Sequence, residues 1–504
     1  MNYKNGVKSV FWGITQQLIT LIFGLIVPRL FISSFGSEVN GLLGSIGNLF
    51  SYLALVEAGV GTAAIQALYG PIGRKDKDEI NGIMSAAGNF YGKAGWVYLA
   101  GVIIIAVLYP ITVKTTMDPQ TVFLLVILNG AGGVINFWVQ GKYMLLFQAE
   151  GKKYLLSITT LVVYVAQNVL KIAFLLAGFD VVIINVGGFC ISLCRVLFYL
   201  VYIRRNYKWL DFHAKPNKKA LAQSGAVFVQ QIMWMLCSNT DVLILTYVAQ
   251  DLKAVSVYGV YLMIYVAIER LYSNIFGSFH YMMGQKFNVD RESYMSVHRI
   301  YEALSMTVAF ALYTIAFVLT TPFMRVYTAG ITDVAYVDKY LPFLFAFMHL
   351  LASAREASSR VINFAGHFKQ MQGRAILETV INIVVSVVAV YWLGIYGVLI
   401  GTIVAYLYRA NDIIIYANRK ILNRSCWATY RLWIINMAVF VIVWLISLFI
   451  DLTVGSFVQF LLIAIPTGIA ICAVYITALW LFERKSARYL LNMAKEAAKR
   501  IMKK

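Results

Sequence analysis

The placement of Lys and Arg between long apolar segments most constrains the fold of this chain. The sequence is 60% hydrophobic and only 13% charged, yet its formal net charge is +20. Apolar stretches of about 20 residues, the length that crosses a bilayer core as a helix, follow one another along the chain. The basic residues gather in every second gap between these stretches, which is typical of cytoplasmic loops. The pattern predicts an all-α polytopic membrane protein.

The gaps predict about fourteen transmembrane helices, with the N and C termini in the cytoplasm. Basic gaps lie at residues 74–77, 152–153, 204–219 and 419–424. The opposite gaps contain few cations and carry acids such as Asp118. The expected spans are residues 10–32, 41–69, 87–110, 120–146, 154–178, 181–203, 224–249, 255–283, 300–321, 340–364, 375–394, 397–418, 432–450 and 457–482.

A weak internal repeat divides the chain into two halves. The Gln-Gln pair at 16–17 recurs at 230–231, and Gly151 has a counterpart in Gly366 at nearly the same offset. Because each repeat holds an even number of spans, both halves have the same orientation, as in transporters with a substrate site between the halves. The expected domains are an N-terminal lobe (1–205), a cytoplasmic interlobe loop (206–223), a C-terminal lobe (224–420), two further spans (421–482) and a basic amphipathic tail on the inner leaflet (483–504).

Several functional classes are excluded. The chain has no soluble basic domain, so we expect no nucleic-acid partner. It lacks the GxxxxGK[ST] motif, so we expect no ATP hydrolysis. Its five cysteines show no CxxC spacing, so neither a resident metal nor a disulfide framework is expected. The first apolar segment is too long for a cleaved signal peptide and should act as an anchor.

Ionisable residues inside the expected spans are the candidate functional groups. Each costs at least about 2.5–3.5 kcal/mol at mid-bilayer, so it should face a cavity or a partner. Arg409 and Asp412 are close enough in sequence to pair, and Arg29 and Lys171 could instead snorkel to the outer surface. A cavity with several guanidinium groups suits a phosphate or pyrophosphate. The candidate anion-binding residues are Arg29, Lys171, Arg195, Arg270, Arg355 and Arg360.

Other polar residues within the spans are candidates for lining the same cavity or for coupling transport to an ion. Glu57 stands directly before Ala58-Gly59, where glycine loosens a helix and exposes its backbone to water. The full set is Glu57, Gln230, Gln231, Glu269 and Glu356.

Diffuse motifs at residues 28–30 (Pro-Arg-Leu), 35–41, 57–60, 239–244 and 255–259 carry a family resemblance. In these the chain resembles bacterial polysaccharide flippases of the Wzx type, in the superfamily that also holds multidrug cation antiporters and lipid II flippases. The resemblance implies two six-helix lobes around a central cavity, with two additional C-terminal helices.

The resemblance also implies a function. By alternating access, an undecaprenyl-pyrophosphate-linked oligosaccharide repeat unit would pass from the inner to the outer leaflet of the bacterial cytoplasmic membrane. The cavity arginines would hold the pyrophosphate. Implied partners are the lipid-linked oligosaccharide, bilayer lipids, and the polysaccharide polymerase and export machinery. The chain would not be an enzyme.

A cation site is a further implication, because lipid II flippases can hold a sodium ion between corresponding spans. The positions here are Asp241, Asn382, Ser386 and Thr402, with Glu378 one turn before Asn382. An acid is expected where Ser386 stands. The implied coupling ion is Na⁺ or H⁺, and no other cofactor is expected.

Alternative functions stay open. A lipid II flippase has a similarly cationic cavity, whereas a multidrug cation antiporter should have an acidic and aromatic one. A membrane polysaccharide polymerase or ligase would place its catalytic residues on a sizeable outer loop. The longest outer gap, residues 321–339, has neither paired carboxylates nor an arginine cluster.

Overall fold

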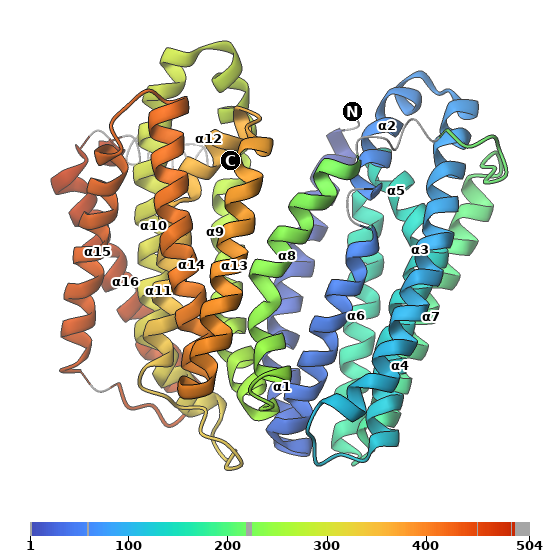
Figure 1. Ribbon diagram of the computed structural model, residues 1–504, viewed down its shortest axis with the longest axis horizontal. Helices are drawn as coiled ribbons and strands as arrows, with labels where there is room; N and C mark the ends of the chain where they lie inside the picture. Colours follow the sequence, from blue (N-terminus) through green and yellow to red (C-terminus); the bar gives the residue numbers. More distant parts are fainter. Residues whose placement is uncertain (1–2, 58–59, 218–223, 451, 485, 489–504) are drawn as a thin grey trace. The chain divides into compact units, whose positions relative to one another are not determined.

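All regular elements of the described chain are helices. The computed structural model describes residues 3–57, 60–217, 224–450, 452–484 and 486–488. Within these residues Figure 1 shows helices and loops alone. The predicted all-α fold is therefore confirmed.

The chain forms two compact units, Met1–Ser256 and Val257–Lys504. The first contains α1 (Tyr3–Leu53), η1 (Ala54–Glu57), α2 (Val60–Arg74), α3 (Lys77–Thr112), α4 (Pro119–Ile135), η2 (Asn136–Gln140), α5 (Gly141–Ala149), α6 (Lys153–Leu176), α7 (Val181–Asn206), α8 (Ser224–Tyr247) and the first turn of α9 (Leu252–Val289). The second contains the rest of α9, α10 (Arg291–Tyr327), α11 (Leu341–Ala354), α12 (Glu356–Phe364), α13 (Phe368–Leu393), α14 (Ile395–Tyr416), η4 (Ala417–Ile421), α15 (Trp427–Ser447) and α16 (Phe457–Phe482). Thus α8, expected in the C-terminal lobe, packs in the first unit.

Eleven described segments are long and apolar enough to cross a membrane. The first, Thr15–Glu57, covers most of the predicted span 10–32 and the first part of span 41–69. The predicted span 340–364 consists of two shorter helices, α11 and α12, that meet at Arg355. A multi-pass topology is thereby supported, while the count of fourteen and the side of the termini stay predictions.

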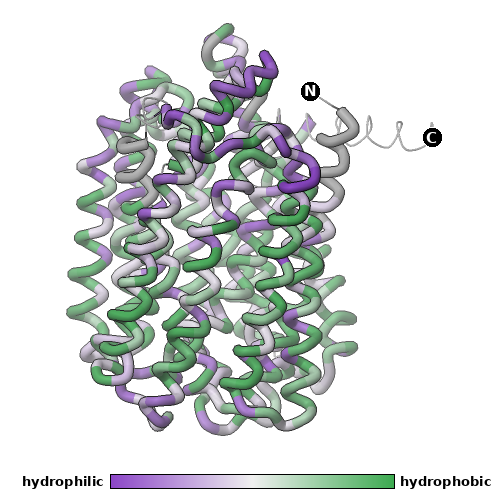
Figure 2. The backbone as a smooth tube through the Cα atoms, turned by 90° about the vertical axis from the view of Figure 1, so that its right-hand side faces the viewer, coloured by the Kyte–Doolittle hydropathy of each residue, from purple (hydrophilic) through white to green (hydrophobic). Residues whose placement is uncertain are grey.

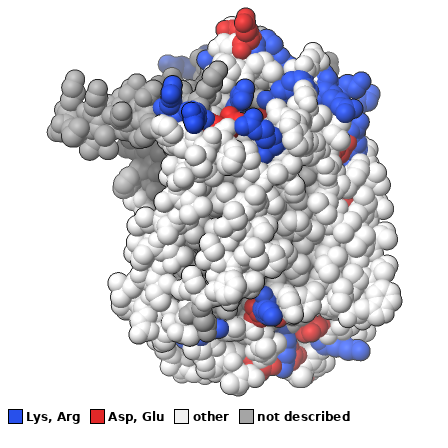
Figure 3. Space-filling view, turned by 90° about the vertical axis from the view of Figure 1, so that its left-hand side faces the viewer, with Lys and Arg blue, Asp and Glu red and all other residues white. Residues whose placement is uncertain are grey.

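The hydropathy of each unit is arranged in bands. The helices on the side of α3, α4 and α7 are mostly hydrophobic along their middle and more hydrophilic at their ends (Figure 2). On the face of the C-terminal unit in Figure 3, a wide belt without charged side chains separates two charged ends, and Lys and Arg dominate one of them. A bilayer core favours such an uncharged belt.

The long element α1 is two helical limbs that meet at Gly36. This glycine has φ 83° and ψ 169°, a conformation that residues with a Cβ rarely adopt. Two residues later, Glu38 accepts hydrogen bonds from the Thr115 hydroxyl at 2.7 Å and from the Thr116 backbone N–H at 2.6 Å. The start of the second limb is thereby tied to the loop that follows α3.

The second limb of α1 packs against α8 and the start of α9 through small and polar residues. Gly41 lies so close to the backbone of α9 that a Cβ there would overlap a carbonyl oxygen. Thr246 donates a hydrogen bond to Ser45 at 2.9 Å. Asn48 donates one to Asn239 at 3.2 Å. Small residues let membrane helices approach closely, and interhelical hydrogen bonds contribute about 0.6 kcal/mol each on average.

Helices α15 and α16 are held to α10 by buried polar contacts. Glu302 of α10 is 1% exposed and forms a 2.6 Å ion pair with Arg424. The same carboxylate accepts a 2.6 Å hydrogen bond from Thr429 of α15. Further along α10, Thr314 shares a 2.7 Å hydrogen bond with Tyr475 of α16. The last two helices are therefore part of the C-terminal unit.

We predict that Arg424→Leu strongly destabilises the C-terminal unit, because it leaves the Glu302 carboxylate buried and without its cation. Removing one partner of a buried ion pair typically costs about 3–5 kcal/mol. The measurement is thermal unfolding of the purified protein. The matched control is Arg431→Leu, because Arg431 is half exposed and its partner Glu483 also contacts Arg299 at 3.6 Å. Since Glu483 keeps a cation, this variant should lose less stability than Arg424→Leu. Equal losses of stability in Arg424→Leu and Arg431→Leu would contradict the assignment of Arg424 as the cation that compensates Glu302.

Candidate functional site

A polar seam runs between α6 and α7 in the N-terminal unit, inside the apolar belt. Gln167 of α6 donates hydrogen bonds to the Gly188 carbonyl and the Ser192 hydroxyl of α7, both at 2.8 Å. One turn further along α6, the Lys171 side chain crosses α7 at Gly188, with Cε 3.7 Å from the place where a Cβ would stand. One turn beyond Ser192, Arg195 continues the seam. We name these side chains, Gln167, Lys171, Ser192 and Arg195, the α6–α7 seam.

The two cations of the seam have no counterion in the described part of the chain. The Arg195 Nε is buried and has no hydrogen-bond partner. Lys171 forms no ion pair or hydrogen bond with a described residue. The sequence explains this, because Asp180 is the one acid between Lys153 and Asn206. Its carboxylate caps α7 by accepting from the Val182 backbone N–H at 2.9 Å.

An unneutralised cation in a low-dielectric region is costly, and the cost falls when an anion binds. The seam supplies two positive charges, whereas the donors of Gln167 and Ser192 are already engaged with each other and with the Gly188 carbonyl. Guanidinium and ammonium groups both form strong charge-assisted hydrogen bonds with phosphate oxygens. The seam therefore has the chemistry of an anion site.

A polar cluster outside the apolar belt lies at the Lys153 end of α6 and the Asn206 end of α7. Tyr207 donates a hydrogen bond to Glu150, and Lys152 pairs with the same carboxylate at 2.7 Å. Burial and the neighbouring Glu150 carboxylate raise the pKa of Tyr207, so its hydroxyl stays protonated and remains a donor. This cluster fixes the loops that flank the two helices.

Glu57 has a partner that the sequence did not reveal. It ends η1, and its carboxylate accepts a hydrogen bond from the Tyr91 hydroxyl of α3. Gly61 leaves space beside both groups, since a Cβ there would lie 3.4 Å from each. Because Glu57 and Tyr91 are far apart in sequence and on different helices, no spacing rule could have linked them.

The C-terminal unit contains a network of three arginines and two carboxylates, which we name the arginine–carboxylate network. Arg355, at the break between α11 and α12, pairs with Glu378 of α13 at 2.7 Å. The other Glu378 oxygen pairs with Arg409 of α14 at 3.1 Å. Arg409 also pairs with Asp412 at 2.9 Å, as the sequence predicted, and Asp412 accepts a further contact from Arg374. The anion-binding candidate Arg355 is thus already neutralised.

The remaining charged candidates of the second unit differ in their contacts. Arg360 pairs with Glu356, one turn earlier on α12, at 2.5 Å. Glu269 and Arg270 lie exposed on α9 and form no ion pair with a described residue. Arg355 additionally stacks on the Tyr406 ring, 4.6 Å from its centroid.

Four predicted residues remain in the first unit. Arg29 is partly buried in α1, and Asp241 is 4% exposed in α8. The side chains of Gln230 and Gln231 lie outside the described residues. The sharing of one central cavity by all six cations stays a prediction.

The neutral members of the predicted cation site do meet between α13 and α14. Asn382 donates a hydrogen bond to the Thr402 hydroxyl at 2.8 Å. Ser386 donates to the Val398 carbonyl at 3.2 Å. The Asn382 Oδ1 atom is buried and has no partner. No group of three or more His, Cys, Asp or Glu in the described residues is placed to hold a metal ion.

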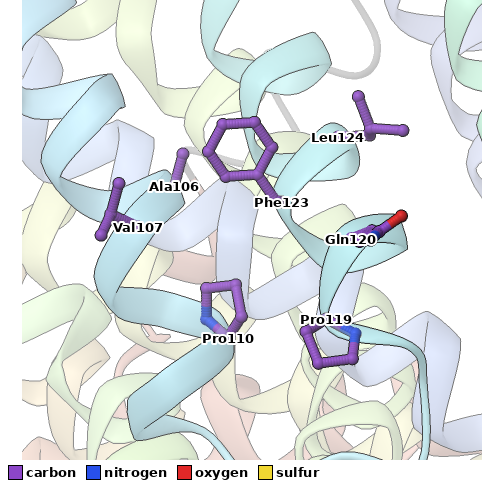
Figure 4. A pocket seen from close by; sticks show the side chains of 7 residues that line it. All are labelled: Ala106, Val107, Pro110, Pro119, Gln120, Phe123 and Leu124. Carbon is purple, nitrogen blue, oxygen red and sulfur yellow. The ribbon is translucent and has the colours of Figure 1, made fainter.

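A shallow groove between α3 and α4 has none of this chemistry. Figure 4 shows its apolar lining, which includes Pro110, Phe123 and Leu124, with Gln120 as its polar member. Phe123 and Leu124 are exposed, which suits contact with lipid. The groove carries no charge for binding an anion.

Comparison with known proteins gives both a family and a fold. A profile of the polysaccharide biosynthesis protein family matches residues 7–285. A comparison with curated protein sequences gave no significant match. The structure is similar to lipid II flippase MurJ in an inward closed conformation, with TM-score 0.67 and 15% identity over 94% of this chain and 99% of that one.

Two multidrug transporters are also similar. For the MATE transporter DinF-BH the TM-score is 0.59 at 14% identity, over 84% of this chain and 97% of that one. For an inward-facing MATE family transporter of the MOP superfamily it is 0.57 at 16% identity, over 80% and 94%. The TM-scores show that these proteins share the fold of this chain. The family match over residues 7–285 agrees with the polysaccharide-flippase resemblance of the sequence.

We predict opposite stability changes for an unpaired and a paired cation. Lys171→Met removes a charge that has no counterion and keeps the side-chain length, so the protein should become more stable, by about 1 kcal/mol or more. Arg409→Met removes the ion pairs that join Glu378 to Asp412, although Arg355 and Arg374 stay on the two carboxylates, and should destabilise by about 1.5–3 kcal/mol. Thermal unfolding of both purified variants checks this. A Lys171→Met protein that is less stable than the parent would show that this cation is structural.

Proposed function

The chain belongs to the polysaccharide biosynthesis protein family, and from that membership we propose that it is a flippase for an undecaprenyl-pyrophosphate-linked oligosaccharide repeat unit. It moves this lipid by alternating access from the inner to the outer leaflet of the bacterial cytoplasmic membrane. There it works beside the polymerase and export machinery that use the product.

The observation that carries the proposal is the pair of uncompensated cations in the α6–α7 seam. A pyrophosphate headgroup supplies the negative charge that Lys171 and Arg195 lack. Gln167 and Ser192 hold α6 and α7 together beside these cations. The paired arginines of the C-terminal unit are a weaker candidate, because an anion would have to displace Glu378 or Glu356 from them.

The driving force follows from the charge of the substrate. The chain has no phosphate-binding loop for ATP. A membrane potential that is negative inside favours outward movement of an anionic headgroup by about 2.3 kcal/mol per charge at 100 mV. We propose that this potential, with or without a coupled ion, supplies the energy.

Lipid II is the second candidate substrate, because the MurJ fold covers nearly the whole chain. It carries the same pyrophosphate, so the seam does not separate the two lipids. A multidrug cation is a poor fit for a seam whose charges are positive.

In the native host, we predict that Lys171→Ala and Arg195→Ala each lower surface polysaccharide at normal membrane levels of the protein. Loss of a charge-assisted contact is worth about 1.5–3 kcal/mol, hence a roughly ten- to hundredfold loss of transport. The lipid-linked precursor should accumulate in the inner leaflet, and Arg195→Lys should retain part of the activity.

Arg205→Ala is the matched control, because Arg205 is an exposed cation at the end of the same helix α7. It should leave polysaccharide unchanged. Normal polysaccharide in both alanine variants of the seam would refute its role. Precursor that reaches the outer leaflet but is not polymerised would favour an enzyme, and a defect confined to peptidoglycan would favour lipid II.

A further inference from the structure

The one acid that the C-terminal unit offers to the predicted cation site, Glu378, is fully engaged by arginine. Glu378 is 6% exposed, and its two oxygens pair with Arg355 at 2.7 Å and with Arg409 at 3.1 Å. A carboxylate whose oxygens both accept from guanidinium groups has little capacity left for a metal ion.

The arginine–carboxylate network as a whole carries excess positive charge. Three arginines face two carboxylates, and Arg409, 9% exposed by side chain, contacts both acids. Asn382 lies one turn after Glu378 on the same helix, about 6 Å along the axis. The positive charge of the network would therefore repel a sodium ion beside Asn382. The repulsion is strong because the distance is short and the dielectric constant of the interior is low.

Asp241 of the predicted site belongs to the N-terminal unit. The other oxygens that the C-terminal unit supplies to the site are neutral and closely packed. Thr402 and Ser386 are 2% and 0% exposed, and both hydroxyls also contact the Val398 carbonyl. A Cβ at Gly401 would overlap Ser386, which shows how little space separates α13 from α14 here. The buried Asn382 Oδ1 is a free acceptor, but one amide oxygen does not replace a carboxylate as compensation for a desolvated ion.

We infer that the Arg409 guanidinium acts as a built-in cation for Glu378 and Asp412, and that this chain binds no sodium ion at Asn382, Ser386 and Thr402. The residues that the C-terminal unit contributes to the sodium site implied by the resemblance thus do not fit it. The C-terminal unit holds α13 and α14 together with a permanent internal charge instead of an exchangeable ion. In the proposed flippase, coupling to a sodium gradient through Asn382, Ser386 and Thr402 is absent.

The test measures ion binding and needs no transport, so its failure is distinguishable from failure of the proposed function. The purified protein is unfolded thermally in NaCl and in choline chloride at equal concentration. A ligand that binds only the native state raises the unfolding midpoint. For the unaltered protein, we expect the unfolding midpoints in NaCl and in choline chloride to agree within about 1 °C. A stabilisation of about 1 kcal/mol would shift the midpoint by several degrees in a small domain.

Two variants examine the role of Arg409. R409Q frees one Glu378 oxygen and removes the excess positive charge, so we expect a midpoint that rises by several degrees with sodium. R374Q is the control: Arg374 contacts Asp412 and no Glu378 oxygen, and its side chain is 41% exposed. It should stay insensitive to sodium.

Two results would overturn the inference. One is a saturable rise of the midpoint with sodium in the unaltered protein that N382A abolishes. The other is a folded R409Q variant whose unfolding midpoint does not change with sodium. In that case the Arg409 guanidinium would not be the group that excludes the ion. If R409Q does not fold, the comparison of salts in the unaltered protein still decides whether a sodium site exists.

Discussion

A charge inside the bilayer requires compensation, and the rest of this structure depends on how each ionisable group meets that requirement. In the C-terminal unit, Arg355 and Arg409 are compensated by Glu378 and Asp412. In the N-terminal unit, Lys171 and Arg195 have no described counterion. The first arrangement stabilises a fixed helix packing, whereas the second keeps a cost that a bound anion would remove. This difference separates structural from functional charges.

The helix breaks place these groups. Arg355 stands between α11 and α12, where the interrupted backbone lets its side chain reach both Glu378 and the Tyr406 ring. Glu57 ends η1 and meets Tyr91 of α3. The buried cluster around Glu302 and the partly exposed cluster around Glu38 then fix the ends of the helices. Non-helical backbone at membrane depth is tolerated where protein surrounds it or water reaches it.

The sequence could predict the fold because apolar length and basic gaps are long-range, redundant signals. The apolar helices and the pair Arg409–Asp412 followed from spacing along one chain, and the family followed from the resemblance of short motifs. Contacts between helices did not: nothing in the sequence distinguished Arg355, which has a carboxylate partner on another helix, from Arg195, which has none. That difference depends on helix rotation and side-chain packing. For the same reason, the expected sodium ligands could be located in the sequence, but the pairing of Arg409 with Glu378 could not be predicted.

The central claim is that the α6–α7 seam binds a pyrophosphate headgroup, and equilibrium binding tests it most directly. The affinity of the purified protein for undecaprenyl pyrophosphate would be measured beside that of the Lys171→Ala/Arg195→Ala double variant. The account predicts a loss of about tenfold or more, since each lost charge-assisted contact is worth at least about 1.5 kcal/mol. Equal affinity in the two folded proteins would contradict it and place the headgroup elsewhere.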